Sequence, residues 1–306
     1  MSPTELRSAI KKVRERTGAP FGVNLRADAA DAAEQVRLIV AEQVPVASFA
    51  QAPTQEFVGR LRDAGVVAIA SVGARRHAEK VAAWGIDAVI ATGAEGGGHV
   101  GAVPTSLLVP QVVDAVDVPV IAAGGFFDGR GLAAALAYGA QGIAMGTRFL
   151  MTRDCPVPQP TKERYTRAGT DDIVLTTKID GLPQRMIRNE TLAQIEKAGR
   201  LRMLWLALSS AWQLKRLTGA SITDLLAAAR KMGHAGEMSL AQSLMAAIAP
   251  VMFQRSMIAG EPQRGLLATG MVAGRLADLP SCDELISSIV REARERLAAL
   301  GAPVVA

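Results

Sequence analysis

A repeating unit of short apolar strand, turn and amphipathic helix fills the first half of this chain and limits the folds open to it. The strands are continuous apolar runs, typical of strands buried on both faces. The six runs are Phe21–Leu25, Val46–Ala50, Val66–Val72, Ala88–Thr92, Val118–Ala123 and Gly142–Met145. The helical patterns between them are Ala29–Ala41, Thr54–Ala64, Arg75–Trp84, Thr105–Ala115 and Gly129–Tyr138. Such regular alternation predicts a parallel sheet, either open or closed.

The number of strands then defines the architecture. A closed (β/α)8 barrel needs eight strands, and the pattern stops after Thr147. Residues 152–188 contain several prolines and are expected to be rich in loops, and residues 192–252 are expected to be nearly all helix, including Arg200–Leu217 and Ser221–Met232. The sequence therefore predicts a TIM-type (β/α)8 barrel that lacks its first two strands in this chain, with an additional helical domain.

The expected domain boundaries follow from this pattern. Residues 1–150, with parts of 260–306, would form the barrel, and residues 151–259 would form a loop and helical domain over the site. Two helix starts carry the Ser-x-x-Glu capping box, at Ser2 and at Ser281 before the final helix Asp283–Leu300.

Composition excludes several classes of function. The net charge of the 306 residues is +5, and the basic residues lie mostly beside acidic ones on helical faces, which argues against nucleic-acid binding. The two cysteines, Cys155 and Cys282, are too few for a disulfide framework and lack metal-ligand spacing. No apolar run approaches the roughly 18 residues of a membrane helix, and the N-terminus is charged. A cytoplasmic protein without metal or membrane is expected.

Glycines at the ends of two neighbouring strands form the strongest chemical signal. Gly124-Gly125 ends one strand, and Gly146-Thr147 ends the next. Without a Cβ in the way, backbone N–H groups at such positions can approach an anion, and the loops after the last two barrel strands recurrently bind phosphate. The alternative is that these glycines only relieve crowding. The pattern favours a phosphorylated ligand or cofactor.

A glycine-rich loop from Glu95 to Gly101 carries the second signal. Its Gly96–Gly101 segment matches G-x-G-x-x-G, but Val103-Pro104 intervenes before the next helix, so a dinucleotide fingerprint is rejected. Three consecutive glycines could lie flat against a planar ring. His99 could act there as acid, base or hydrogen-bond donor, or it could only brace the loop. Glu95 is expected to stabilise the loop.

Other polar and aromatic residues leave alternatives open. His77 and His234 are expected at the solvated surface. Trp205 and Trp212 would pack in the core or contribute to a homodimer. Four residues after a turn could reach an anionic substrate or could equally anchor the loop; these are Gln184, Arg185, Arg188 and Asn189.

The region from Ala91 to Leu150 closely resembles the nitronate monooxygenases, whose fold is shared by flavin-dependent enoyl-ACP reductases. The resemblance rests on Glu-Gly-Gly-Gly-His-Val-Gly, on Val-Pro-Val-Ile-Ala-Ala-Gly-Gly-Phe-Phe-Asp-Gly-Arg-Gly and on Ala-Met-Gly-Thr-Arg-Phe-Leu, and it extends to Pro20–Asn24 and Gly270–Gly274. It implies an FMN-binding barrel with His99 as the catalytic residue. The implied flavin contacts are Asn24, Thr92, Gly97, Gly98, Gly124, Gly125, Ala144, Met145, Gly146 and Thr147.

The chain departs from the family pattern in two respects. Thr92 and Ala144 stand where glutamine is common in the family. Family members also begin with two strands that precede the first helix of this sequence, so the start codon is assigned too late or the protein is a truncated form. A six-stranded remnant would expose sheet edges and apolar surface, which favours aggregation.

The resemblance implies oxidation of an alkyl nitronate with O2 to a carbonyl compound and nitrite. His99 would donate a hydrogen bond to the nitro group or take the α proton of a nitroalkane. One alternative is an NAD(P)H-dependent flavin reductase of an enoyl or other activated C=C thioester. A second alternative, suggested by the missing strands, is a truncated, non-catalytic protein without flavin.

Overall fold

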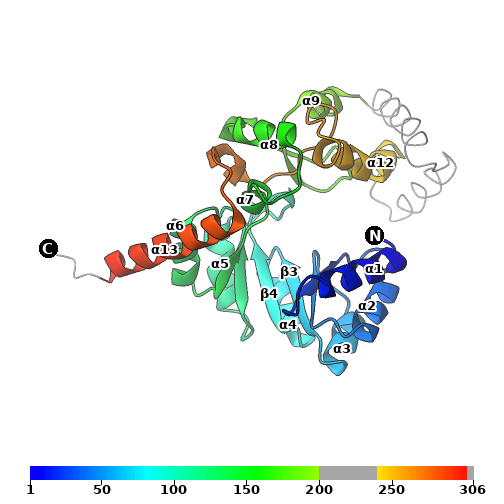
Figure 1. Ribbon diagram of the computed structural model, residues 1–306, viewed down its shortest axis with the longest axis vertical. Helices are drawn as coiled ribbons and strands as arrows, with labels where there is room; N and C mark the ends of the chain where they lie inside the picture. Colours follow the sequence, from blue (N-terminus) through cyan, green and yellow to red (C-terminus); the bar gives the residue numbers. More distant parts are fainter. Residues whose placement is uncertain (200–239, 302–306) are drawn as a thin grey trace.

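The computed structural model describes residues 1–199 and 240–301 (Figure 1). Its main feature is a six-stranded parallel sheet with the order β1-β2-β3-β4-β6-β7. The strands are β1 (Gly22–Leu25), β2 (Val46–Phe49), β3 (Val67–Val72), β4 (Ala88–Thr92), β6 (Val120–Ala123) and β7 (Gly142–Ala144). Each of the six predicted strands is confirmed.

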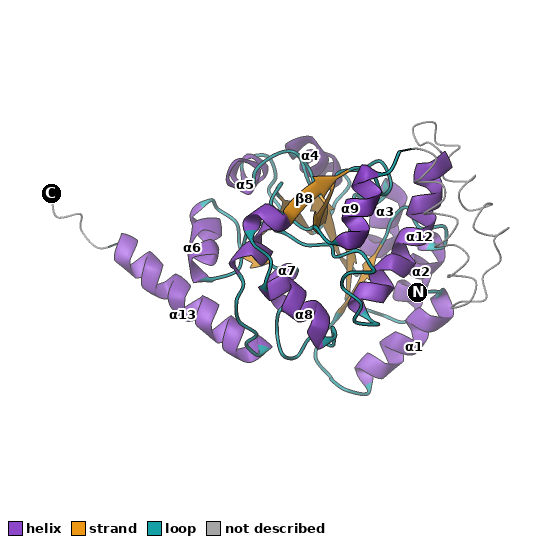
Figure 2. Cartoon of the chain, turned by 90° about the horizontal axis from the view of Figure 1, so that it is seen from above, coloured by secondary structure: helices purple, strands orange, loops and turns teal. Residues whose placement is uncertain are grey.

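The helices between the strands cover one face of this sheet (Figures 1 and 2). They are α2 (Ala32–Ala41), α3 (Gln55–Asp63), α4 (Arg75–Ala83), α5 (Thr105–Val113) and α6 (Gly129–Ala137). The first helix, α1 (Pro3–Arg14), packs beside α2. The Ser2 capping box is present, with Ser2 Oγ accepting from the Glu5 N–H and the Glu5 carboxylate accepting from the Ser2 N–H.

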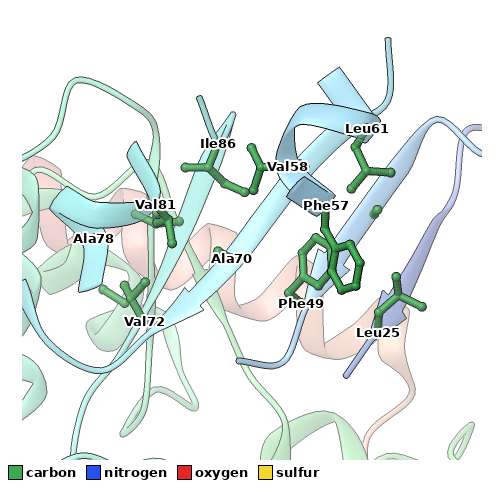
Figure 3. Close-up of a cluster of buried hydrophobic side chains, with 14 of the residues drawn as sticks. Leu25, Phe49, Phe57, Val58, Leu61, Ala70, Val72, Ala78, Val81 and Ile86 are labelled. Atoms are coloured by element: carbon green, nitrogen blue, oxygen red, sulfur yellow. The ribbon is translucent and has the colours of Figure 1, made fainter. Parts of the chain in front are cut away.

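The core lies between the helices and the sheet (Figure 3). Phe49 of β2 stacks on Phe57 of α3 with ring centroids 6.4 Å apart, and Val58 and Leu61 of α3 are fully buried. Each such side chain stabilises the fold by roughly 1.5–3 kcal/mol through removal of apolar area from water. This helix-facing layer holds the sheet in shape.

The other face of the sheet is less covered than the apolar runs predicted. Buried residues alternate with partly exposed ones along β3, and Val67 is 43% exposed. The expectation of strands buried on both faces was therefore wrong. Burial of the inner face requires side chains from strands on the opposite side of a closed barrel, and this sheet is open, with β1 and β7 as its edges within the described residues.

A second, antiparallel sheet crosses the carboxyl ends of the parallel strands. Its order is β5 (Gly98–His99), β9 (Gln184–Ile187) and β8 (Ile173–Thr176). Residues 152–188 were predicted to be rich in loops, and loops do separate the elements there, but the sequence did not predict β8, β9 and helix α8 (Gln159–Thr166). β9 mixes polar and apolar residues and pairs with the distant Gly98 and His99, so no local apolar run marks it.

Helices α7 (Thr147–Leu150), α9 (Glu190–Lys197) and α12 (Leu240–Met257) lie on the side of this second layer (Figure 1). The last described helix, α13 (Cys282–Leu300), lies beside α6 of the first layer. The predicted capping box at Ser281 is present, and α13 packs along α6, where the Gly129 N–H donates to Glu292 at 2.8 Å. The predicted helices Arg200–Leu217 and Ser221–Met232, with Trp205, Trp212 and His234, lie outside the described residues.

None of the helices in residues 1–199 and 240–301 combines the length and apolar character needed to cross a membrane.

Candidate functional site

A glycine-walled cavity of about 560 Å³ opens at the carboxyl ends of β4, β6 and β7. Chain topology places these ends together, because parallel strands end at the same edge of a sheet. Nine of the ten residues expected to bind a cofactor line it, and they are Thr92, Gly97, Gly98, Gly124, Gly125, Ala144, Met145, Gly146 and Thr147. The two glycine motifs therefore converge, as the strand-end argument required.

Two kinds of glycine form the wall. Gly124 and Gly125 have φ values of +93° and +83°, which side-chain-bearing residues rarely adopt. A Cβ on Gly124 would also lie 3.1 Å from the Gly93 O and Gly96 N atoms. Gly146 has no heavy atom within 4 Å of the position of its Cβ. Crowding therefore explains Gly124, while at Gly146 the open space belongs to the cavity.

Backbone donors face no protein acceptor in this wall. Within residues 1–199 and 240–301, the N–H groups of Gly124, Gly125 and Gly146 make no hydrogen bond to the protein. Gly124 is half-buried, and Gly125 and Gly146 are exposed, so these N–H groups are open to a ligand in the cavity. Phosphate oxygens can accept hydrogen bonds from such donors.

The side chains of Glu95 and Thr147 stabilise the cavity wall through hydrogen bonds. Glu95 Oε2 accepts from the Thr105 N–H at 2.9 Å and from Thr105 Oγ1 at 2.6 Å, which confirms the loop-stabilising role predicted for Glu95. Thr147 Oγ1 accepts from the Gly270 N–H at 2.9 Å. Sequence reasoning did not place the Ala268–Gly270 segment in this wall, although it lines the same cavity.

A second cavity of about 730 Å³ adjoins the first and shares Thr92 and Gly97 with it. His99 and Asn24 line this second cavity. Asn24 is thus the one predicted cofactor residue that the structure places away from the glycine-walled cavity; its side-chain oxygen accepts from Ser48 Oγ at 3.0 Å.

The outer part of this second cavity is basic. His77 and Lys80 of α4 line it, both exposed. The predicted surface position of His77 is therefore confirmed. Lys80 also lies over the Trp84 ring, with 5.0 Å from Nζ to the ring centroid, which restricts where its ammonium group is held.

His99 is held by a partner that sequence reasoning missed. Its Nε2 lies 2.7 Å from Asp180 Oδ2, and the same oxygen accepts from Gln184 Nε2 at 2.6 Å. Burial by itself raises the pKa of Asp180, but the hydrogen bonds from His99, Gln184 and the Leu182 N–H together hold that pKa below its usual value. No sequence pattern links Asp180 to a histidine 81 positions away.

The polar residues of β9 and the adjoining loop mainly anchor the chain. Arg185 Nη2 donates to the Ala94 carbonyl at 2.7 Å, and burial lowers the pKa of Arg185 while the Glu95 charge opposes that shift. Asn189 caps α9 and donates to the Pro262 and Gly265 carbonyls. Arg188 Nε lies 3.9 Å from Glu196. Of the two roles left open for these residues, the contacts match anchoring.

No group of three or more histidine, cysteine or acidic side chains within residues 1–199 and 240–301 could hold a metal ion. Cys155 and Cys282 are free thiols. The described site therefore consists of a glycine-walled cavity beside a second cavity that contains a histidine–carboxylate pair.

The family model described as nitronate monooxygenase matches residues 31–292. This chain belongs to the nitronate monooxygenase family. Its members are flavin-dependent oxidoreductases with a β/α-barrel fold, in agreement with the resemblance that the Gly-rich motifs carried. The chain is thus an enzyme of this family, and its open sheet corresponds to part of that barrel.

Three relatives refine the comparison. A (3aS,4S,5R,7aS)-5-hydroxy-7a-methyl-1-oxo-octahydro-1H-indene-4-carboxyl-CoA dehydrogenase of Mycobacterium tuberculosis is 52% identical over 96% of this chain and 83% of its own length. The enzyme of the same name from Rhodococcus jostii is 49% identical over 99% of this chain and 86% of its own length. The solved structure of FabK from Thermotoga maritima is 31% identical, with a TM-score of 0.77 over 98% of this chain and 84% of FabK.

Proposed function

We propose that this family member is an FMN-dependent oxidoreductase that dehydrogenates the CoA thioester of a polycyclic carboxylic acid. The observation that carries the proposal is the pair of adjoining cavities, one lined by free backbone donors and the other by His99, Lys80 and His77. Two relatives about half identical to this chain are named as dehydrogenases of a bicyclic carboxyl-CoA, and the chain aligns with them over nearly its whole length.

The glycine-walled cavity fits the FMN phosphate. Its unpaired N–H groups at Gly124, Gly125 and Gly146 supply donors without a fixed positive charge. Gly97 and Gly98, which line the same cavity from the β4–β5 loop, would contact the ring system. When bound, FMN would supply the redox chemistry by accepting a hydride.

His99 would move the proton. The hydrogen on the carbon next to a thioester carbonyl is acidic enough for a positioned imidazole to remove it. His99 would take the proton from that carbon, and FMN held by the glycine-walled cavity would supply the hydride acceptor for the neighbouring carbon. The two hydrogens removed would account for the new C=C bond of the product.

The size and charge of the second cavity favour a thioester of CoA over a small nitronate. About 730 Å³ is in the range of cavities that hold drug-sized ligands, whereas an alkyl nitronate has only a few heavy atoms. Lys80 and His77 at the outer part could pair with the phosphates of CoA, because a lysine ammonium acts as a point charge toward phosphate.

The decisive experiment mixes FMN-loaded protein with the indene-carboxyl-CoA thioester named for the relatives, under anaerobic conditions. We expect the flavin absorbance to bleach within seconds in the wild-type protein. Replacement His99→Gln should slow bleaching by about 10²–10⁴-fold, the usual contribution of a general base. If the thioester leaves the flavin oxidised while a nitronate reduces it, the proposal is wrong.

Oxidation of an alkyl nitronate with O2 is the second candidate, and the description of the matching family favours it. Its test is aerobic turnover of propyl-1-nitronate with measurement of nitrite. Parallel assays settle the remaining alternatives. NAD(P)H consumption with an enoyl thioester would indicate a reductase, and the absence of any bound flavin after reconstitution would indicate a non-catalytic protein. A homodimer through the helices of residues 192–252 stays a prediction.

A further inference from the structure

The antiparallel sheet places Asp180 and His99 together by its register. His99 of β5 pairs with Gln184 of β9, and Asp180 lies in the turn that joins β8 to β9. The Asp180 side chain bridges back to both, through Nε2 of His99 at 2.7 Å and Nε2 of Gln184 at 2.6 Å. The second oxygen, Oδ1, accepts from the Leu182 N–H at 3.1 Å.

Two fixed donors, from Gln184 and Leu182, and the His99 ring thus hold one carboxylate. Because the Gln184 amide nitrogen and the Leu182 amide can only donate, Asp180 is committed to the acceptor role on both oxygens. An ionised carboxylate has no proton to give, and the lowered pKa of Asp180 agrees with ionisation across the neutral range. The hydrogen between Asp180 and His99 therefore belongs to the imidazole Nε2.

The location of that proton decides the chemistry of the other nitrogen. A neutral imidazole carries a single N–H, so a proton on Nε2 leaves Nδ1 with a free lone pair. Within the described residues, the ring makes no hydrogen bond other than those at Nε2, and His99 lines the larger cavity. Nδ1 is the nitrogen left to accept a proton from a ligand there.

We propose that Asp180 is a positioning residue that holds a proton on Nε2 of His99 and leaves Nδ1 as the proton acceptor toward the substrate cavity. The inference deepens the proposed function and rests on it for the identity of the reaction. The tautomer itself is a property of the protein and is measurable without any substrate.

Charged groups near the pair come from two other elements. Arg26 and Asp28, which follow β1, form an ion pair with 2.6 Å between Nη2 and Oδ2, and each lies close enough to act electrostatically on the pair. His77 and Lys80 of α4 line the same cavity as His99. Since Arg26 and Asp28 largely neutralise one another, Asp180 is the direct determinant of the imidazole tautomer.

The experiment is nitrogen-15 NMR of the full-length, FMN-loaded protein labelled at histidine, recorded at about pH 9, where an ordinary imidazole with a pKa of about 6.5 is neutral. The chain has three histidines, and the His99→Gln variant identifies the His99 signals. We expect the wild-type protein to show a protonated Nε2 and an unprotonated Nδ1. An unprotonated Nε2 in the wild-type protein would overturn the proposal without reference to any variant.

Variants then test whether Asp180 is the cause. In Asp180→Asn the fixed Leu182 N–H keeps the side-chain oxygen on its own side, so the NH2 takes the place of Oδ2. This NH2 donates to Nε2 of His99, and the Gln184 amide turns to present its oxygen to it, so we expect the His99 proton to move to Nδ1. In Asp180→Glu a carboxylate remains, and the Nε2–H tautomer should return. Asp172→Asn is the matched control, since Asp172 accepts from the Gly169 N–H on the same segment away from His99. An unchanged tautomer in Asp180→Asn, or the same change in Asp172→Asn, would refute the assignment.

Failure of the proposed function and failure of the positioning role of Asp180 give different results. If the thioester and the nitronate both leave the flavin oxidised, yet the tautomer changes in Asp180→Asn alone, the positioning role stands and the substrate is wrong. If the thioester is oxidised and the tautomer is unaffected by Asp180, the proposed function stands and the positioning role is wrong.

Discussion

The two adjoining cavities are built in different ways. The glycine-walled cavity uses backbone atoms at the ends of β4, β6 and β7, held by the parallel sheet and its core. The His99 cavity uses side chains, and the partner of its central residue comes from the turn between β8 and β9. The comparison indicates that the first cavity depends on where glycines occur, whereas the second depends on long-range side-chain pairing.

The largest effect is expected for Gly124→Ala. A Cβ there would lie 3.1 Å from two backbone atoms and from Thr105 Oγ1, at a φ of +93°. We expect the free energy of unfolding to fall by roughly 1–2 kcal/mol because of the left-handed backbone and by about 1–3 kcal/mol because of overpacking. Bound flavin should be lost as well. Urea unfolding and the flavin spectrum measure both. Gly142→Ala is the control, because its Cβ would meet no atom within 4 Å; an equal loss there would contradict the explanation.

Replacement of Gly146 separates cofactor binding from stability. Its φ is −87° and its Cβ would meet no protein atom within 4 Å, so Gly146→Ala should fold as well as the wild-type chain. If the cavity holds FMN, the new methyl group meets the ligand, and FMN affinity should fall by at least about tenfold, equivalent to about 1.4 kcal/mol. Fluorescence titration with FMN gives this value. Unchanged affinity would place the cofactor elsewhere.

Tyr165 tests the support behind the first cavity. Its ring is fully buried and its hydroxyl donates to the Ala268 carbonyl at 2.6 Å, next to residues of the cavity wall. Burial raises the pKa of Tyr165, so the phenol stays protonated. Tyr165→Phe should cost about 0.5–1.5 kcal/mol of stability, measured by urea unfolding, while FMN affinity changes less than in Gly146→Ala.

The smallest effect concerns pH. The folded pKa of Asp180 lies below the value of about 3.9 for a free aspartate, so the unfolded state binds the proton first as pH falls. Its contribution to stability is therefore complete well above pH 4 and is lost as pH falls through the folded pKa. The difference in Tm between wild type and Asp180→Asn should shrink between about pH 6 and pH 3. A Tm difference that grows as the pH falls would contradict this prediction.

The sequence by itself determined the parallel half of the fold. Strand and helix periods are local, so β4 was placed at its observed bounds and α13 was predicted to begin one residue after its observed start. The glycine motifs could also be placed at one edge, because parallel strands must end together. Nine of ten predicted contacts therefore share a cavity.

Only the tertiary structure decided how the antiparallel sheet forms and which side chains meet in the second cavity. β9 mixes polar and apolar residues (Gln-Arg-Met-Ile), and it pairs with β5 across 85 positions, from His99 to Gln184. The Asp180–His99 pair exists because that register and the following turn bring the two side chains together. Asn24 ended in the second cavity because β1 lies at the far edge of the sheet from β7. Local periodicity records which elements form, but long-range pairing decides which side chains meet, and the proton chemistry of this site depends on that pairing.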